Sequence, residues 1–170
     1  GRFPGMAGRT MGVIGYGAIG QGVGQRARGL GMEVIAHDPY MQTAPDGSEM
    51  VSFEALLERA DVITLCCNQT PENFHLLNAE TLSRARDGVI LCNVARGGLI
   101  DEAALIAALE SGKVGAAALD VFETEPLPQD HPLMGFENVA LSSHNANSTI
   151  EAIEYVHANT LDNLFKHLKG

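Results

Sequence analysis

The sequence lacks long apolar runs and is poor in positive charge. No stretch among its 170 residues, 45% of them apolar, approaches the ~18 consecutive apolar residues that a membrane-spanning helix requires. The N-terminal segment has no apolar run after its arginines, so we see no secretory signal peptide. Only 11 basic residues stand against 21 acidic ones, giving a formal net charge of −10. This balance argues against partners that are nucleic acids or anionic membranes.

Cysteine is scarce, and its spacing excludes the common zinc motifs. Cys66, Cys67 and Cys92 contain no C-x-x-C pair, so we predict no metal site. Cys66 and Cys67 are neighbours in a predicted strand, so their side chains should point to opposite faces of a sheet. We interpret all three as buried thiols in a reducing compartment, and predict a cytoplasmic protein.

Apolar patterns typical of strands and helices alternate along the whole chain. Alternation of this kind predicts right-handed crossovers between parallel strands. The expected fold is therefore α/β, a Rossmann-type doubly wound parallel sheet in three α/β/α layers, with residues 1–170 as one domain. Strands are predicted at 10–14, 33–37, 62–67, 89–93, 114–121 and 139–141; helices at 19–30, 53–60, 79–86, 102–111 and from about 149; and a surface loop at 41–49.

A glycine-rich turn follows the first predicted strand. It reads Gly15-Tyr16-Gly17-Ala18-Ile19-Gly20 and opens the first predicted helix. In this context Gly15 permits the tight turn, Gly17 lets backbone approach a pyrophosphate, and Gly20 allows close helix–strand packing. The N–H groups that begin the helix can bind phosphate. The alternative is a tight turn that binds nothing.

Asp38 ends the second predicted strand, where a carboxylate can accept both hydroxyls of an adenine ribose. It would repel a ribose 2′-phosphate, which favours NAD over NADP as the cofactor. Alternatively, Asp38 only opens an Asp-Pro turn. In an open parallel sheet, ligands lie beyond the C-terminal ends of the strands.

Three further residues near strand ends could carry chemistry. Arg96 follows the fourth strand, and its planar guanidinium suits a carboxylate or α-keto acid, although a surface arginine is equally consistent with the sequence. His144 follows the sixth strand and could exchange a proton between alcohol and ketone, or be structural. Glu125 could accept a hydrogen bond from His144, but spacing does not choose between Glu125 and Glu123.

These motifs, in this order, resemble the nucleotide-binding domain of the D-2-hydroxyacid dehydrogenases, a family that includes phosphoglycerate dehydrogenase. The resemblance runs from 8–15 through 93–102 and 117–122 to 143–145 and the final helix. It implies an NAD-dependent oxidoreductase that interconverts a D-2-hydroxy acid and its 2-keto acid. Hydride passes between cofactor and C2 carbonyl, while His144 is the general acid/base, Glu125 its partner and Arg96 the binder of carboxylate and carbonyl. The cofactor residues it implies are Gly15, Gly17, Ala18, Ile19, Gly20, Asp38, Cys67, Val94, Ala95, Arg96, Asp120 and His144, with Asp120 on the nicotinamide carboxamide.

The chain departs from the family pattern at several positions. Ala18 stands where arginine is common, Asn68 where proline is usual, and the residues at 145–149 resemble a phosphoglycerate-dehydrogenase-like subgroup. We expect this chain to lack the family's substrate-binding domain, and therefore to bind NADH but to turn over 2-keto acids barely or not at all. The resemblance also implies a homodimer formed through this domain. Corepressors that sense NAD(H) share the resemblance, so a binding module without turnover is the alternative function.

Overall fold

The computed structural model describes residues 5–168 and contains a seven-stranded, entirely parallel sheet with the order β3-β2-β1-β4-β5-β6-β7. The predicted Rossmann-type α/β fold is confirmed. The strands are β1 Thr10–Ile14, β2 Glu33–His37, β3 Glu49–Met50, β4 Val62–Leu65, β5 Val89–Asn93, β6 Val114–Leu119 and β7 Val139–Leu141. The helices are α1 Ala18–Gly29, α2 Phe53–Arg59, α3 Ala79–Arg84, α4 Glu102–Glu110 and α5 Ile150–Leu168, with short 3-10 turns at Pro71–Asn73, Gly97–Leu99 and Pro132–Gly135.

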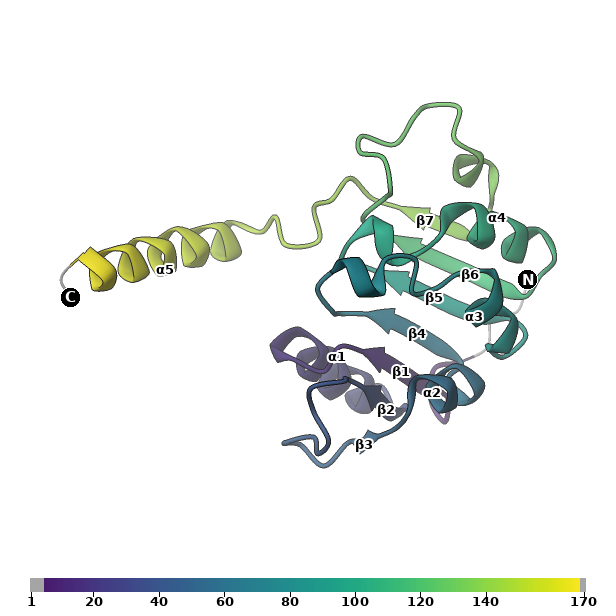
Figure 1. Ribbon diagram of the computed structural model, residues 1–170, viewed down its shortest axis with the longest axis horizontal. Helices are drawn as coiled ribbons and strands as arrows, with labels where there is room; N and C mark the ends of the chain where they lie inside the picture. The colour runs from purple at the N-terminus through teal and green to yellow at the C-terminus, as the bar shows by residue number, and fades with distance from the viewer. Residues whose placement is uncertain (1–4, 169–170) are drawn as a thin grey trace.

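Helices cover the two faces of the sheet unequally. In Figure 1, α1 lies behind β1 and β2, whereas α2, α3 and α4 lie in front of the sheet. Each face has its own apolar core, because successive strand residues point to opposite sides. Val13 packs toward α1 with Tyr16 and Ala27, and Ile14 packs toward the other helices with Leu56.

The chain reverses its winding between β1 and β4, which are neighbours in the sheet. From β1 it winds outward to β2 and β3, and from β4 it winds the other way to β7. In open α/β sheets the crevice at such a switch point is where ligands bind. The glycine turn 15–20 lies at the carboxyl end of β1, beside the residues that follow β4.

The structure shortens two predicted strands and adds one. The strand predicted to reach Cys67 ends at Leu65, because Ile14 and Asn93 are the last residues paired with it and β1 turns away at Gly15. The strand predicted at 114–121 ends at Leu119 for the same reason. The loop predicted at 41–49 contains the start of the short edge strand β3, whose two residues are too few for a periodicity to be recognised.

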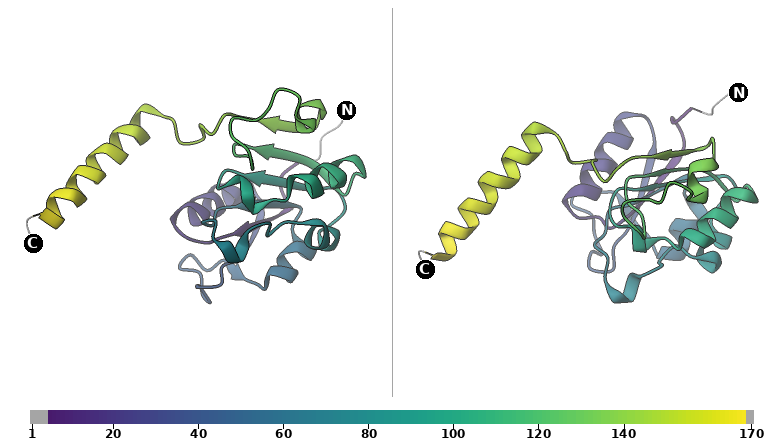
Figure 2. Two further views of the ribbon diagram at one scale, coloured as in Figure 1. Left: turned by 45° about the horizontal axis from the view of Figure 1, so that its top comes forward. Right: turned by 90° about the horizontal axis from the view of Figure 1, so that it is seen from above.

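The final helix, α5, stands apart from the sheet and its covering helices, as Figures 1 and 2 show from three directions. None of its residues is buried, and the predicted apolar face of Ile153, Val156, Leu161, Leu164 and Leu168 is 46–71% exposed. Packing against the core of the described chain therefore does not account for this face. No helix within residues 5–168 has the length and apolar content needed to cross a membrane.

Candidate cofactor cleft and active site

The glycine turn has the geometry that its three glycines predicted. Gly15 has φ +88°, and a Cβ there would lie 2.6 Å from the Cys67 backbone nitrogen. A Cβ at Gly20 would lie 2.1 Å from the Gly15 carbonyl oxygen, so Gly20 is required for the helix to begin this close to the strand. Gly17 has nothing within 4 Å of the corresponding position, which leaves its backbone open to a ligand.

The first turn of α1 suits an anion. Gly17 is its N-cap and supplies no side-chain acceptor, and the first turn contains no acidic residue. The leading N–H groups are therefore available, and the helix dipole adds partial positive charge. An opening of this kind fits the pyrophosphate of a dinucleotide.

Asp38 is held beside this turn by two backbone N–H groups. Its carboxylate accepts from Tyr16 N at 2.9 Å and from Tyr40 N at 2.9 Å. The contact with Tyr40 N is the turn expected under the alternative interpretation of Asp38, and the contact with Tyr16 N places the same carboxylate beside the glycine turn. Because a carboxylate offers about four acceptor sites, it retains capacity for ribose hydroxyls.

Two adjoining cavities follow the carboxyl ends of the strands. One, of about 590 Å³, is bordered by Gly15, Gly17, Ala18, Ile19, Asp38 and Cys67 among others. The other, of about 710 Å³, is bordered by Ile19, Cys67, Val94, Ala95, Arg96, Asp120 and His144 among others. Together they form a cleft that is bordered by all of the predicted cofactor residues except Gly20. Gly20 instead packs against the Gly15 backbone within the turn.

Arg96 is presented by a tight turn after β5. Asn93, 1% exposed, fixes this turn by donating from Nδ2 to the Arg96 carbonyl at 2.8 Å and accepting from Ala95 N at 3.0 Å. The Arg96 guanidinium donates to the Ala95 carbonyl at 2.5 Å and borders the cleft. Sequence reasoning did not assign Asn93, although a buried amide at a strand end signals a backbone-fixing role.

His144 contacts Glu125, the partner that the family resemblance selected. The distance between His144 Nδ1 and Glu125 Oε2 is 2.7 Å, and Glu125 Oε1 accepts from Phe122 N at 3.0 Å. The hydrogen bonds from His144 and Phe122 lower the pKa of Glu125 and favour its ionised form. The ionised carboxylate orients the ring with Nδ1 protonated, leaving Nε2 for the cleft.

The His144 loop is wrapped around the buried carboxylate of Asp120. That carboxylate accepts from Ser142 Oγ at 2.6 Å and from the N–H groups of Asn145 and Ala146, each at 2.9 Å. Burial alone would raise the pKa of Asp120, but these hydrogen bonds outweigh it and the pKa is lowered. His144 itself has φ +55°, a conformation rare for residues with side chains and common at functional sites.

Replacing Asp120 with asparagine should lower the free energy of unfolding by about 2 kcal/mol at pH 7, because an amide cannot accept all three hydrogen bonds. Since the folded pKa lies below the unfolded one, the carboxylate's contribution is present above pH ~4 and is lost as the pH falls through the folded value. Urea unfolding of both proteins between pH 7 and 3 should show the difference shrinking with acid. The control is Asp87→Asn, an exposed partner of Lys113 that should cost less than 1 kcal/mol. A pH-independent difference would contradict this assignment.

Comparisons with known proteins agree with the cleft. The sequence profile for "D-isomer specific 2-hydroxyacid dehydrogenase, NAD binding domain" matches residues 2–146. The chain is 43% identical to D-3-phosphoglycerate dehydrogenase 3 of Arabidopsis thaliana, covering 97% of this chain and 29% of the plant protein. It is 42% identical to hydroxypyruvate reductase of Blautia hydrogenotrophica, covering 96% of this chain and 51% of that protein.

A solved structure of a glyoxylate reductase from Paecilomyes thermophila superimposes with a TM-score of 0.89 at 38% identity, covering 94% of this chain and 49% of that one. The chain therefore spans about half, or less, of the length of these relatives. They are dehydrogenases and reductases, and no observation favours the corepressor alternative. The chain belongs to the NAD-binding domain of the D-isomer-specific 2-hydroxyacid dehydrogenase family.

Proposed function

We propose that this domain serves an enzyme that interconverts a D-2-hydroxy acid and its 2-keto acid with NAD(H). One observation carries the proposal: His144, which is paired with Glu125, and Arg96 border the same cleft that the glycine turn opens. A general acid/base and a guanidinium beside a dinucleotide site are the groups that reversible carbonyl reduction requires.

The chain's own residues account for cofactor binding. Gly17, Ala18 and Ile19 would hold the pyrophosphate through backbone N–H groups, because Ala18 offers no cationic side chain. Asp38 would accept the adenine ribose hydroxyls. Cys67, Val94 and Ala95 would border the nicotinamide half. When bound, the nicotinamide supplies or accepts the hydride.

The proton and the negative charge would be handled by residues that border the same cavity. In the reducing direction, His144 Nε2 would donate a proton to the carbonyl oxygen while Glu125 holds Nδ1. Arg96 would bind the substrate carboxylate and stabilise charge developing on the carbonyl oxygen. In this role Asp120 orients the His144 loop, and one of its oxygens retains capacity for the nicotinamide carboxamide.

The proposal is tested with the longer protein that contains this domain. NADH oxidation should be saturable with a 2-keto acid such as hydroxypyruvate, glyoxylate or 3-phosphohydroxypyruvate. Binding of NADH with no turnover of any 2-keto acid would overturn the enzymatic proposal and favour the alternative function, a binding module without turnover.

We propose that a second domain completes the site. Among the described residues bordering the cleft, Arg96 carries the one fixed positive charge, enough for one carboxylate. A phosphate-bearing substrate such as phosphoglycerate would need cations from elsewhere. The isolated chain should accordingly bind NADH and show little or no turnover.

Asp38 should set the preference for NADH over NADPH. Replacing it with serine removes the charge that repels a 2′-phosphate and one acceptor for the ribose hydroxyls. We expect NADH affinity to fall by about tenfold and the ratio of NADH to NADPH affinity to fall further, by about 10²-fold. Fluorescence titration of the chain with each nucleotide measures both. Glu49→Ser, at an exposed ion pair with Arg59, is the matched control. An unchanged ratio would contradict the role of Asp38.

We also propose a homodimer and a cytoplasmic location. The exposed apolar face of α5 supports association, since monomeric proteins rarely expose large contiguous apolar patches. Sedimentation of the chain should show a dimer that Leu161→Glu and Leu164→Glu weaken; a monomer at all concentrations would contradict this proposal. Three free thiols, Cys66, Cys67 and Cys92, support a reducing compartment.

A further inference from the structure

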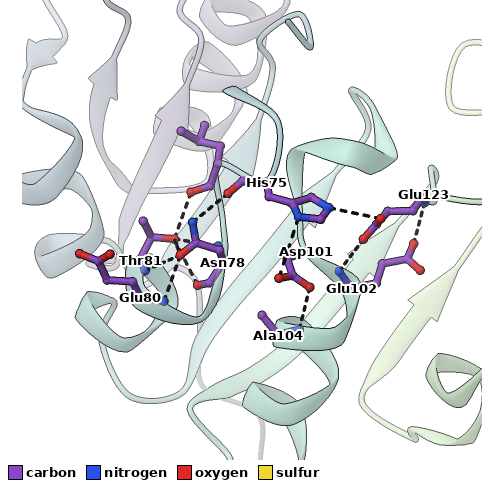
Figure 3. Close-up of polar contacts among 9 residues, drawn as sticks. His75, Asn78, Glu80, Thr81, Asp101, Glu102, Ala104 and Glu123 are labelled. Carbon is purple, nitrogen blue, oxygen red and sulfur yellow. Dashed lines mark hydrogen bonds and ion pairs between the residues drawn. The ribbon is translucent and has the colours of Figure 1, made fainter. Parts of the chain in front are cut away.

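Two histidines and three carboxylates form a cluster outside the residues that border the cleft. His75 precedes α3, Asp101 and Glu102 begin α4, and Glu123 lies in the segment that follows β6; Figure 3 shows these four side chains converging. His131 contacts Glu102 from the turn before Pro132–Gly135. No group of metal-binding geometry is found among residues 5–168, so cation binding does not explain the cluster.

At its centre, Glu102 and Glu123 exchange hydrogen bonds. Glu102 N donates to Glu123 Oε1 at 2.9 Å, and Glu123 N donates to Glu102 Oε1 at 2.7 Å. Each carboxylate thus binds the other residue's backbone, which joins the first turn of α4 to the segment after β6 at two points. We call this arrangement the Glu102–Glu123 pair.

A histidine faces the second oxygen of each carboxylate. His75 Nε2 lies 3.2 Å from Glu123 Oε2, and His131 Nε2 lies 3.2 Å from Glu102 Oε2. His131 Nδ1 accepts from Leu133 N at 3.4 Å, which leaves Nε2 to carry the proton that faces Glu102. His75 Nε2 is buried, and its contact with Glu123 lacks the geometry of a hydrogen bond. The other ring nitrogen of His75, Nδ1, lies 4.0 Å from Asp101 Oδ2.

The pair is connected to both halves of the candidate active site. Glu123 is two residues before Glu125 in the segment that follows β6. In the same segment, the backbone N–H of Phe122 donates to the Glu125 carboxylate. On the other side, a Cβ at Gly97 would lie 1.9 Å from the Phe122 carbonyl carbon, so the Arg96 turn is in backbone contact with this same segment. His75 N also donates to the Gly98 carbonyl at 2.8 Å.

We propose that the Glu102–Glu123 pair, with His75 and His131, positions Glu125 against His144. The same pair fixes the position of the turn after β5 that contains Arg96. These are positioning residues, since none borders the cleft. Two hydrogen bonds, each from a backbone N–H to a carboxylate, fix segment 122–125. The position of this segment determines whether the Glu125 carboxylate meets Nδ1 of His144. The proposal rests on the proposed function for its catalytic meaning, but the geometry it concerns is measurable without turnover.

The experiment reads the ring of His144 in the isolated chain by long-range ¹H–¹⁵N correlation, with the resonance assigned by His144→Gln. In the wild type the ring should be held with Nδ1 protonated. Glu102→Ala and Glu123→Ala should each reduce that tautomer by about half or more, in the same direction as Glu125→Ala, which removes the acceptor of the Nδ1 proton. Glu123→Gln keeps an oxygen to accept Glu102 N and should restore most of the wild-type signal.

Loss of stability alone would give a different pattern. Glu80→Ala, which breaks an exposed ion pair with Arg84, is the matched carboxylate control and should leave the tautomer unchanged. If the alanine variants lower Tm but leave the tautomer unchanged, the pair only stabilises the fold and the proposal is overturned. Should an alanine variant not fold, His75→Ala tests the same connection and should also reduce the tautomer, with an unchanged signal overturning the proposal. A longer protein that lacks turnover would refute the proposed function without altering this result.

Discussion

Replacing His144 with alanine in the longer protein should reduce kcat for 2-keto acid reduction by about 10³-fold, with NADH affinity kept within about twofold. Among the described residues that border the 710 Å³ cavity, His144 is the one histidine, and Glu125 orients its ring through a contact of 2.7 Å. Steady-state kinetics with NADH and an active 2-keto acid, together with nucleotide titration, separate the two effects.

The matched control for this variant is His157→Ala, on the exposed helix α5. It should leave both kcat and NADH affinity unchanged. A loss of less than about tenfold in kcat for His144→Ala would contradict general acid catalysis by this residue, because a positioned proton donor contributes at least ~10²-fold.

Gly97→Ala should have the largest effect on stability of any single methyl addition near the site. The added Cβ would lie 1.9 Å from both the carbonyl carbon and the carbonyl oxygen of Phe122. These are backbone atoms flanked by the Glu125 and Glu123 hydrogen bonds, so they cannot move aside cheaply. We expect a loss of more than about 3 kcal/mol in the free energy of unfolding, measured by urea denaturation.

Gly29→Ala, at the end of α1, provides the control for a methyl group added to a glycine. Nothing lies within 4 Å of its Cβ position, so the substitution should leave the free energy of unfolding unchanged or raise it slightly through helix propensity. Equal losses for the two variants would show that backbone proximity at Gly97 is not what requires a glycine there.

The sequence predicted the fold well wherever the pattern is local. The alternation of strand and helix and the glycine turn both depend on residues close in the chain, and the structure contains each of them. The short strand β3 was missed because two residues at a sheet edge carry no periodicity. The strands predicted at 62–67 and 114–121 extend two residues too far, because their ends are set by where pairing with the neighbouring strands stops.

The residues of the candidate site could be predicted from the sequence, but the contacts that hold them in place could not. Motif order identified Arg96, Glu125 and His144, and the structure adds the contact between the last two. The supporting groups were not recognised: Asn93, Ser142 and the Glu102–Glu123 pair act through contacts across 3 to 22 residues of sequence, as the hydrogen-bond separations show. Spacing could not show which of Glu123 and Glu125 faces the histidine, since each forms a carboxylate–histidine contact with a different ring.

The central claim is that one cleft brings together the glycine turn and His144 around NAD(H). Titration of the isotopically labelled chain with NADH, followed by ¹H–¹⁵N correlation spectra, tests it most directly. The account predicts that the amides of Gly17, Ala18 and Ile19 and the ring of His144 shift together along one saturation curve. Saturable shifts that leave either the glycine turn or His144 unaffected would contradict it.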